Sequence, residues 1–170
     1  IMTDTGSFSY GTSDPGMYDT LSALVRFDID TERIHSLVYD NFSAARFRLM
    51  GYCLYHKMVI LPEYRTAYIS LTANELKMFN FVPGDTEGFV NLPLSVKDVV
   101  FSAIFIEKEK IVKTSFRSRG RFPVNSFSSA HFNGGGHMNA AGGESTLPLE
   151  KVIDYFTQLL PDYHHLLMNT

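Results

Sequence analysis

The sequence predicts an α/β protein in which a mixed β-sheet is flanked by helices and preceded by a helical stretch. Up to about residue 57, apolar residues recur with the period of a helix behind capping residues. After that point, short strand-like runs alternate with helical ones. Hydrophobic residues make up 45% of the 170 residues and include 14 Phe, so the chain can bury a sizeable core.

Helices are expected throughout the first stretch. Residues 13–15 (Ser-Asp-Pro) combine a capping side chain with an early proline and predict a helix to about residue 26. Residues 30–31 (Asp-Thr) cap a second helix, and a third runs from residue 43 to about residue 57. Ahead of them, residues 1–6 (Ile-Met-Thr-Asp-Thr-Gly) have the pattern of a buried strand that ends in a turn, so we expect the chain to begin inside a domain.

Strands dominate the structure expected after residue 57. The elements predicted here are strands at 58–61, 65–71, 98–106 and 111–117, and helices at 72–80, 124–132 and from Pro148 to a stop before Pro161. Thr72 and Glu75 form a capping box at the start of the first of these helices. We therefore divide the chain into a helical part, 1–57, and a strand-rich part, 58–170.

Composition narrows the class of protein. The net charge of -3 excludes a general polyanion binder, although six of the fifteen Lys and Arg residues fall between 108 and 121. That basic cluster suits a small anionic ligand or a short strand better than long duplex DNA. The single Cys53 cannot form an internal disulfide and is expected to be a buried thiol. No signal peptide or membrane-length apolar run is visible, so we expect a cytoplasmic protein without membrane contact.

The most distinctive motif is Phe-Asn-Gly-Gly-Gly-His-Met-Asn-Ala-Ala-Gly-Gly at 132–143. Consecutive glycines cost backbone entropy, but they let several N–H groups converge on an oxyanion. We expect Gly134, Gly135 and Gly136 to form such a phosphate-binding loop, with His137 donating at its lip. The small residues 140–142 would form a short helix whose N-terminus favours the same anion. The alternative is a flexible turn followed by a small-residue helix.

A second phosphate-binding candidate ends the strand at 111–117. Arg117 offers a planar fork of donors that matches phosphate, and Ser118 adds a hydroxyl. Alternation along an extended segment would place Arg117 and Arg119 on one face. The alternative is a solvated strand end, which is the commoner meaning of a run of charges.

Asp4 is the candidate metal ligand. It follows the expected strand end, where ligand-binding carboxylates often lie in α/β sheets, and its oxygens suit Mg²⁺ or Mn²⁺. The alternative is a cap of a turn, because the sequence places no His and carboxylate cluster beside it. Asp85 and Glu87 are candidate acid–base residues. We interpret Asp85 instead as the cap of a short helix that packs through Phe89 and Val90.

The order of these motifs resembles one family. Gly-Gly-Gly-His-x-x-Ala-Ala-Gly at 134–142, preceded by a strand that ends in Arg-Ser, is similar to the DHH-associated C-terminal domain of the DHH phosphoesterases. The opening Thr-Asp-Thr-Gly-Ser-Phe at 3–8 resembles the last metal-binding motif of the DHH catalytic domain. The spacing resembles the branch of nanoRNA-degrading enzymes and 3′-phosphoadenosine 5′-phosphate phosphatases, over essentially the whole chain.

The resemblance implies a hydrolase. Residues 1–57 would be the end of its DHH catalytic domain plus connecting helices, and residues 58–170 its DHH-associated substrate-binding domain. The full-length enzyme would use two Mn²⁺ or Mg²⁺ ions to activate water against a phosphoester in short oligonucleotides or 3′-phosphoadenosine 5′-phosphate. Asp4 matches a metal-ligand position of the family. The positions that match those holding the substrate phosphate or nucleotide are Arg117, Ser118, Gly135, Gly136 and His137. The Asp-His-His motif that names the family is absent, so we expect it upstream of Ile1 and expect this chain alone to be inactive.

Two other roles stay open at the level of sequence. Similar C-terminal domains accompany alanyl-tRNA synthetase-like proteins, so the alternative function is a nucleic-acid-binding module. Such a module would have no need of Asp4 at a strand end, whereas the phosphoesterase does. A homodimer formed through bare apolar faces is a further expectation for partners.

Overall fold

The computed structural model describes residues 1–3, 5–8 and 13–170, which fall into two compact units, Ile1–Ser43 and Ala44–Thr170. The first unit contains helices α1 (Pro15–Val25) and α2 (Thr31–Tyr39). The carboxylate of Asp14 accepts from the Gly16 N–H, and that of Asp30 accepts from the Arg33 N–H. Both expected helix starts are therefore confirmed.

Two expectations for the first unit are wrong. Residues 2–3 and 5–8 lie in turns rather than a strand end, and the Thr5 N–H donates to the Ile1 carbonyl. A strand needs a neighbouring strand for its backbone bonds, and the described residues of this unit form only helices and turns. The helical period that predicts α1 and α2 also predicts that Leu24 and Leu37 are buried, but these side chains are 39% and 60% exposed. The helical period places these side chains on one face of each helix, but the described part of the unit has few residues that cover that face.

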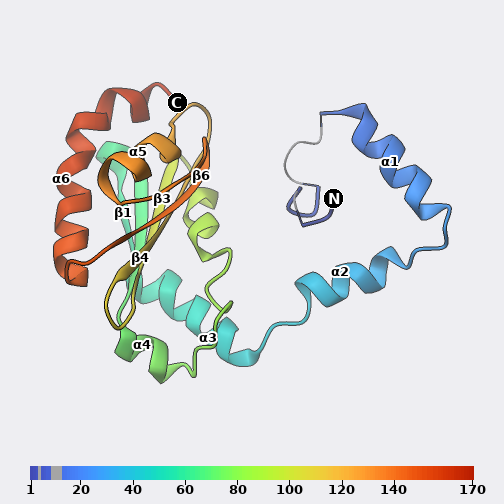
Figure 1. The fold of residues 1–170 in the computed structure, drawn as a ribbon, viewed down its shortest axis with the longest axis horizontal. Helices are drawn as coiled ribbons and strands as arrows, with labels where there is room; N and C mark the ends of the chain where they lie inside the picture. Colours follow the sequence, from blue (N-terminus) through green and yellow to red (C-terminus); the bar gives the residue numbers. More distant parts are fainter. Residues whose placement is uncertain (4, 9–12) are drawn as a thin grey trace. The chain divides into compact units, whose positions relative to one another are not determined.

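The second unit is built on a mixed sheet, which confirms the predicted fold class. Its described residues form six strands in the order β1-β2-β3-β4-β6-β5, antiparallel except for the parallel pair β2 and β3 (Figure 1). The strands are β1 (Met58–Leu61), β2 (Thr66–Leu71), β3 (Phe101–Glu107), β4 (Val112–Ser118), β5 (Gly135–His137) and β6 (Ala140–Ser145). The strands expected at 98–106 and 111–117 form the antiparallel β3–β4 hairpin.

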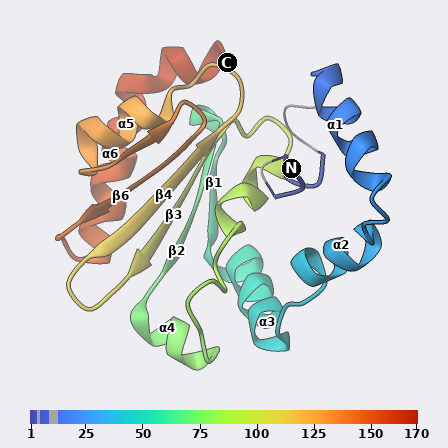
Figure 2. The ribbon, with the colours of Figure 1, turned by 45° about the vertical axis from the view of Figure 1, so that its right-hand side comes forward.

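Helices cover the sheet unequally on its two faces. Those of this unit are α3 (Ala44–Tyr52), which continues as the π-helical turn η1 (Cys53–Lys57), then η2 (Pro62–Tyr64), α4 (Ala73–Met78), η3 (Phe89–Ser95), α5 (Val124–His131) and α6 (Leu149–Met168). Figure 2 shows α5 and α6 on one face, and α3, α4 and η3 on the side of β1 to β3. We call the face under α5 and α6 the covered face.

An aromatic cluster forms the core of the covered face. Its members include Phe105 and Phe116 from the sheet and Phe132 and Phe156 from the helical side. The ring centroids of Phe116 and Phe132 lie 5.0 Å apart, and those of Phe105 and Phe156 lie 5.1 Å apart. Such pairs add attraction beyond the burial of their area, so this cluster fixes the helices on the sheet.

The opposite face has an aliphatic core over β2 and β3. Ile69, Leu71, Ile104 and Ile106 of the sheet pack against buried residues of α3, η1, α4 and η3. Cys53 lies in this cluster with no exposed surface, and burial raises its pKa to about 12. The expected buried thiol is confirmed.

The capping box is also confirmed. The Thr72 hydroxyl accepts from the Glu75 N–H at 3.1 Å, and the Glu75 carboxylate accepts from the Thr72 N–H at 2.8 Å. Asp85 has a different role from the one expected, because its carboxylate accepts from the Val82 N–H and caps a turn. The helix that packs through Phe89 and Val90 exists, but it begins after Gly88.

The last helix does not stop before Pro161. It runs on to Met168, although proline cannot donate the backbone bond that the helix ladder requires there. Leu160 and Leu167, on either side of the proline, are both fully buried in the aromatic cluster. Burying a leucine contributes roughly 1.5–3 kcal/mol, which is enough to offset the missing bond.

Candidate functional site

The glycine-rich segment is a hairpin of two strands rather than a loop followed by a helix. Residues 135–137 pair antiparallel with 140–142, so the short helix expected at 140–142 is wrong. Strand β6 also pairs with β4, and the Ser128 hydroxyl of α5 donates to the Gly142 carbonyl at 2.8 Å. Helix propensity differs by only about 0.7 kcal/mol between ordinary residues, so this tertiary bonding outweighs it.

Some of the glycines are required by close contact between backbones. A Cβ built on Gly134 would lie 2.0 Å from the Gly142 carbonyl oxygen, and one on Gly143 would lie 2.3 Å from that of Phe132. Gly136 has a φ of +145°, and its Cβ would lie 2.5 Å from the Ala140 oxygen. The Gly134 N–H already donates to the Ser128 carbonyl. These glycines serve the fold of the hairpin.

The register of the three strands brings Arg117 and His137 onto one row. Arg117 of β4 lies opposite Ala140 of β6, which lies opposite His137 of β5. Residues directly opposite one another in a sheet point to the same face. Phe116 is buried in the aromatic cluster, so its neighbour Arg117 points to the other face. We call this face of β4, β6 and β5 the open face.

The open face is accessible to a ligand. His137 and Gly135 are exposed, and Arg117, Ala140 and Gly142 are half-buried. A guanidinium Nη1 of Arg117 donates to the Phe116 carbonyl at 2.9 Å, which holds the side chain beside its own strand. A guanidinium has five N–H donors in a planar fork, and an imidazole can donate from either nitrogen. The row therefore presents two groups that can bind one anion.

Ser118 does not join this row. It lies opposite Phe101 on the covered face and is 7% exposed. Its hydroxyl donates to the Phe122 carbonyl at 2.6 Å and accepts from the Asn139 side chain at 2.8 Å. It ties the end of β4 to the turn of the β5–β6 hairpin.

Ser115 is the hydroxyl on the open face, and sequence reasoning missed it. It lies opposite Gly142, two residues before Arg117. Strand parity was the signal that could have found it, because residues two apart share a face. Arg119 lies in the bend after β4, where its N–H donates to the Val100 carbonyl, so the expected strand alternation does not extend to it.

Arg46 stabilises the segment that packs on the neighbouring strands of this side of the sheet. No pattern in the sequence predicted this role. Its guanidinium donates to the carbonyls of Gly84 and Glu87, at 3.0 and 2.8 Å, and to that of Asp85. It also lies 5.1 Å from the centre of the Phe89 ring. These contacts fix η3, which packs against β3 and β4.

A metal site is not assembled by the described residues. Asp4, the candidate ligand, lies outside them. Within 1–3, 5–8 and 13–170, no three His, Cys, Asp or Glu side chains group closely enough to hold a metal ion. The donor sets that Mg²⁺ and Mn²⁺ prefer require several such oxygens, so these residues alone do not fit the ions.

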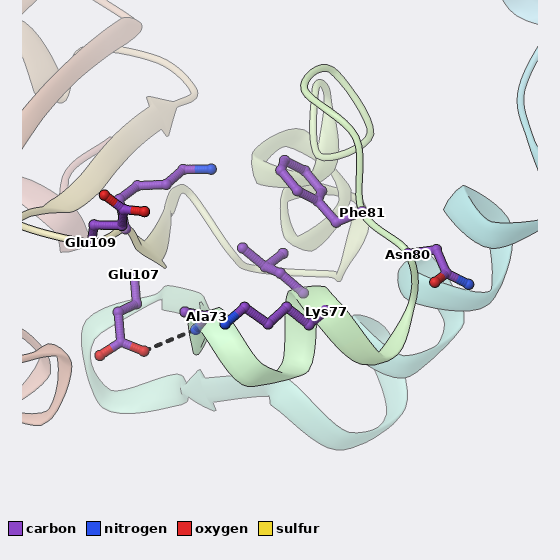
Figure 3. A pocket seen from close by; sticks show the side chains of 8 residues that line it. Ala73, Lys77, Asn80, Phe81, Glu107 and Glu109 are labelled. Carbon is purple, nitrogen blue, oxygen red and sulfur yellow. Dashed lines mark hydrogen bonds between the residues drawn. The ribbon is translucent and has the colours of Figure 1, made fainter.

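A separate cavity of about 380 Å³ lies at the other end of the β3–β4 hairpin (Figure 3). The Lys108 ammonium lies 4.6 Å from the centre of the Phe81 ring, and Glu107 accepts from the Ala73 N–H at 2.8 Å. The lining combines two lysines, Lys77 and Lys108, with the carboxylates of Glu107 and Glu109. This balance of charge does not favour an anion, so the phosphate candidates remain on the open face.

Comparisons with known proteins agree with this fold. The model of the DHHA1 domain family matches residues 68–163, which is more than half of the chain. The structure of an exopolyphosphatase-related protein from Bacteroides fragilis aligns with a TM-score of 0.95 and 44% identity, covering 98% of this chain and 49% of that one. The chain thus spans about half the length of that relative.

The pGpG-specific phosphodiesterase PggH from Vibrio cholerae shares the fold at a TM-score of 0.52 and 12% identity, over 85% of this chain and 50% of that one. No curated protein sequence matches the chain. In the part of the chain that the structure describes, no helix is both long and apolar enough to cross a membrane. By its domain match and its fold, the chain belongs to the DHHA1 family, the DHH-associated domain of DHH phosphoesterase-family proteins.

Proposed function

We propose that the open face binds the phosphate of a nucleotide between Arg117 and His137. The observation that carries the proposal is the shared row of Arg117, Ala140 and His137. Two inter-strand spacings separate Arg117 from His137, about 10 Å between their Cα atoms. Both long side chains can reach a phosphate above Ala140, which is too small to block it.

The whole protein, in this proposal, is a metal-dependent phosphoesterase of the branch that acts on short oligonucleotides or 3′-phosphoadenosine 5′-phosphate. The names of the two relatives support phosphorus chemistry, since one is exopolyphosphatase-related and the other is a phosphodiesterase. The basic cluster between residues 108 and 121, in a chain of net charge -3, suits a nucleotide or a short strand better than a duplex.

Two Mn²⁺ or Mg²⁺ ions would supply the activated water when bound. Asp4 is the one residue of this chain proposed as a ligand of such an ion. Arg117 and His137 would hold the phosphate and neutralise its charge. This chain alone is then a binding half that does not hydrolyse phosphoesters, and we place the full protein in the cytoplasm.

The test is titration of the purified chain with adenosine monophosphate, followed by calorimetry or NMR. Removing a hydrogen bond to a charged group costs about 1.5–3 kcal/mol, so Arg117→Ala should weaken binding by about tenfold or more. His137→Ala should weaken it less, because an imidazole nitrogen donates one bond to the phosphate whereas a guanidinium can donate two.

Arg119→Ala is the matched control, since it removes the same charge two residues away and outside the strand. It should bind as the parent does. The proposal is wrong if Arg117→Ala and His137→Ala also bind as the parent does. Equal weakening by Arg117→Ala and Arg119→Ala would instead indicate general attraction by the basic cluster.

A further inference from the structure

We infer that Ser102 of β3 is a positioning residue for Arg117, because its hydroxyl can accept a hydrogen bond from the guanidinium when that group binds a phosphate. The inference rests on the proposed phosphate site and adds a residue beside it. Ser102 lies directly opposite Arg117 on the antiparallel β3–β4 pair. The row of Arg117, Ala140 and His137 therefore continues to Ser102, whose side chain points to the same side of the sheet.

The Ser102 hydroxyl is buried and unpaired. Ser102 has no exposed surface, and its Oγ makes no hydrogen bond to any residue that the structure describes. Burial of a hydroxyl without a hydrogen bond destabilises a fold, so proteins satisfy nearly all such groups. A hydroxyl that the fold leaves unpaired needs another reason to be there.

Arg117 is the polar side chain that lies directly beside Ser102. On the other side the row continues to Ala67 of β2, which packs in a small apolar cluster. Ser115 of β4 lies one row away, and such diagonal pairs are about 7–8 Å apart, too far for two short side chains. The Cβ atoms of an opposite pair are only about 4.5–5.5 Å apart, which an arginine side chain can span.

Ser102 and the proposed phosphate lie on opposite sides of Arg117. The phosphate is placed above Ala140 of β6, whereas Ser102 belongs to β3. A guanidinium has N–H donors around a planar fork, so it can donate to a phosphate from one edge and to a hydroxyl from another. Arg117 Nη1 already donates to the Phe116 carbonyl. A bond to Ser102 gives the group a second fixed point on the side away from the anion, and a group held in its binding geometry loses less freedom on binding.

A second buried hydroxyl provides a matched comparison. Thr114 of β4 also has no exposed surface, and its Oγ1 also lacks a partner among the described residues. It lies opposite Phe105, which belongs to the aromatic cluster of the covered face. The two hydroxyls therefore share burial and lack of a partner, but only Ser102 lies on the row of Arg117.

Titration of the purified chain with adenosine monophosphate and with inorganic phosphate, followed by NMR, tests the role of Ser102. Ser102→Ala should weaken the binding of both ligands by about tenfold, because the lost bond orients the group that holds the anion. Its free energy of unfolding should not fall, since the substitution removes an unpaired buried oxygen. Thr114→Val removes the other unpaired hydroxyl and should bind both ligands within about twofold of the parent.

A double substitution shows whether Ser102 acts through Arg117. In the Arg117→Ala background, Ser102→Ala should cause no further loss of affinity, because its partner is already absent. A residue that acted through packing alone would weaken binding by the same factor in both backgrounds, and that result would overturn the inference.

The remaining outcomes separate Ser102 from the phosphate site. If Ser102→Ala binds like the parent while Arg117→Ala does not, the role of Ser102 is wrong and the phosphate site stands. A lower free energy of unfolding for Ser102→Ala, or an equal loss of binding in Thr114→Val, assigns the hydroxyl to the fold and also overturns the inference. A parent chain that binds neither ligand overturns the phosphate site and the role of Ser102 with it.

Discussion

The two faces of β4 have different surroundings, although successive residues of this one strand alternate between them. Phe116 points into the aromatic cluster of the covered face and has no exposed surface. Its neighbours Ser115 and Arg117 point to the open face and remain half-buried. One strand therefore supplies the core with every second residue and the candidate ligand site with the others.

The glycine-rich hairpin shows the same division by a different means. Gly136 shares the row of Phe116 and is fixed by its backbone conformation, whereas Gly135 shares the row of Ser115 and meets nothing. A motif of identical residues thus combines positions where the fold requires glycine with a position where it does not. We therefore expect different substitutions to change stability and ligand binding in this molecule.

Removing a ring from the covered face should have the largest effect. Phe116→Ala leaves a cavity in the aromatic cluster and should lower the free energy of unfolding by about 3–5 kcal/mol. Arg117→Ala, the next residue, removes the bond to the Phe116 carbonyl and should lower it by about 1 kcal/mol. Urea unfolding followed by circular dichroism measures both. Similar losses for the two variants would break the distinction between the faces.

The next largest difference in the free energy of unfolding is expected between substitutions of two glycines. Gly134→Ala places a methyl group into the Gly142 carbonyl and should cost about 1–3 kcal/mol through overpacking. Gly135→Ala adds the same atom to open space and should be neutral or slightly stabilising. The same unfolding measurement compares them. A destabilised Gly135→Ala would show that this position also serves the fold.

Substitutions of Ser115 and Ser118 should differ by a smaller amount in the free energy of unfolding. Ser118→Ala removes the bonds to Phe122 and Asn139 and should cost roughly 1–1.5 kcal/mol. Ser115→Ala should leave stability within about 0.5 kcal/mol of the parent. In binding, the order should reverse, with Ser115→Ala weakening the affinity for adenosine monophosphate and Ser118→Ala preserving it. Any other order would argue against the assigned faces.

Lowering the pH should have the smallest effect on the free energy of unfolding, through a carboxylate on the side of the sheet under α3 and α4. Burial raises the pKa of Glu75, but hydrogen bonds from Lys57, Thr72 and Tyr52 outweigh it and lower the pKa to about 2. Because the unfolded value is near 4.5, the stabilisation is complete above that pH and is lost as the pH falls toward 2.

Glu75→Gln should therefore flatten this part of the pH profile. Between pH 6 and pH 3, the free energy of unfolding should fall further for the parent than for the variant. The difference should be roughly 1 kcal/mol or less, since solvent screens a partly exposed group. Tyr52→Phe is a control that removes one of the three partners and should give a profile between the two. Parallel profiles for the parent and Glu75→Gln would contradict the assignment.

Local signals in the sequence predicted much of this fold. The capping box at Thr72 and Glu75, the caps at Asp14 and Asp30, and the β3–β4 hairpin each depend on residues close together in the chain, and all are present. Patterns that act at short range can be interpreted without knowledge of the partner elements.

The errors came from long-range contacts. The β5–β6 hairpin depends on Ser128 and on pairing with β4, which no local pattern of glycine and alanine reveals. The continuation of α6 past Pro161 depends on burial of Leu167. In the candidate site, residue type alone indicated Arg117 and His137, and the structure places them on one row. The position of Ser115 on the same face follows only from the strand register.

The alternation along β4 also limits how this domain can change in length. One residue inserted between Val112 and Arg117 would exchange the faces of every residue beyond it, exposing a phenylalanine or burying a guanidinium. Two inserted residues would keep the faces but move Arg117 off the row of His137. The turn at 108–111 lies outside this constraint. Insertions and deletions should therefore be tolerated in that turn and excluded from the strand.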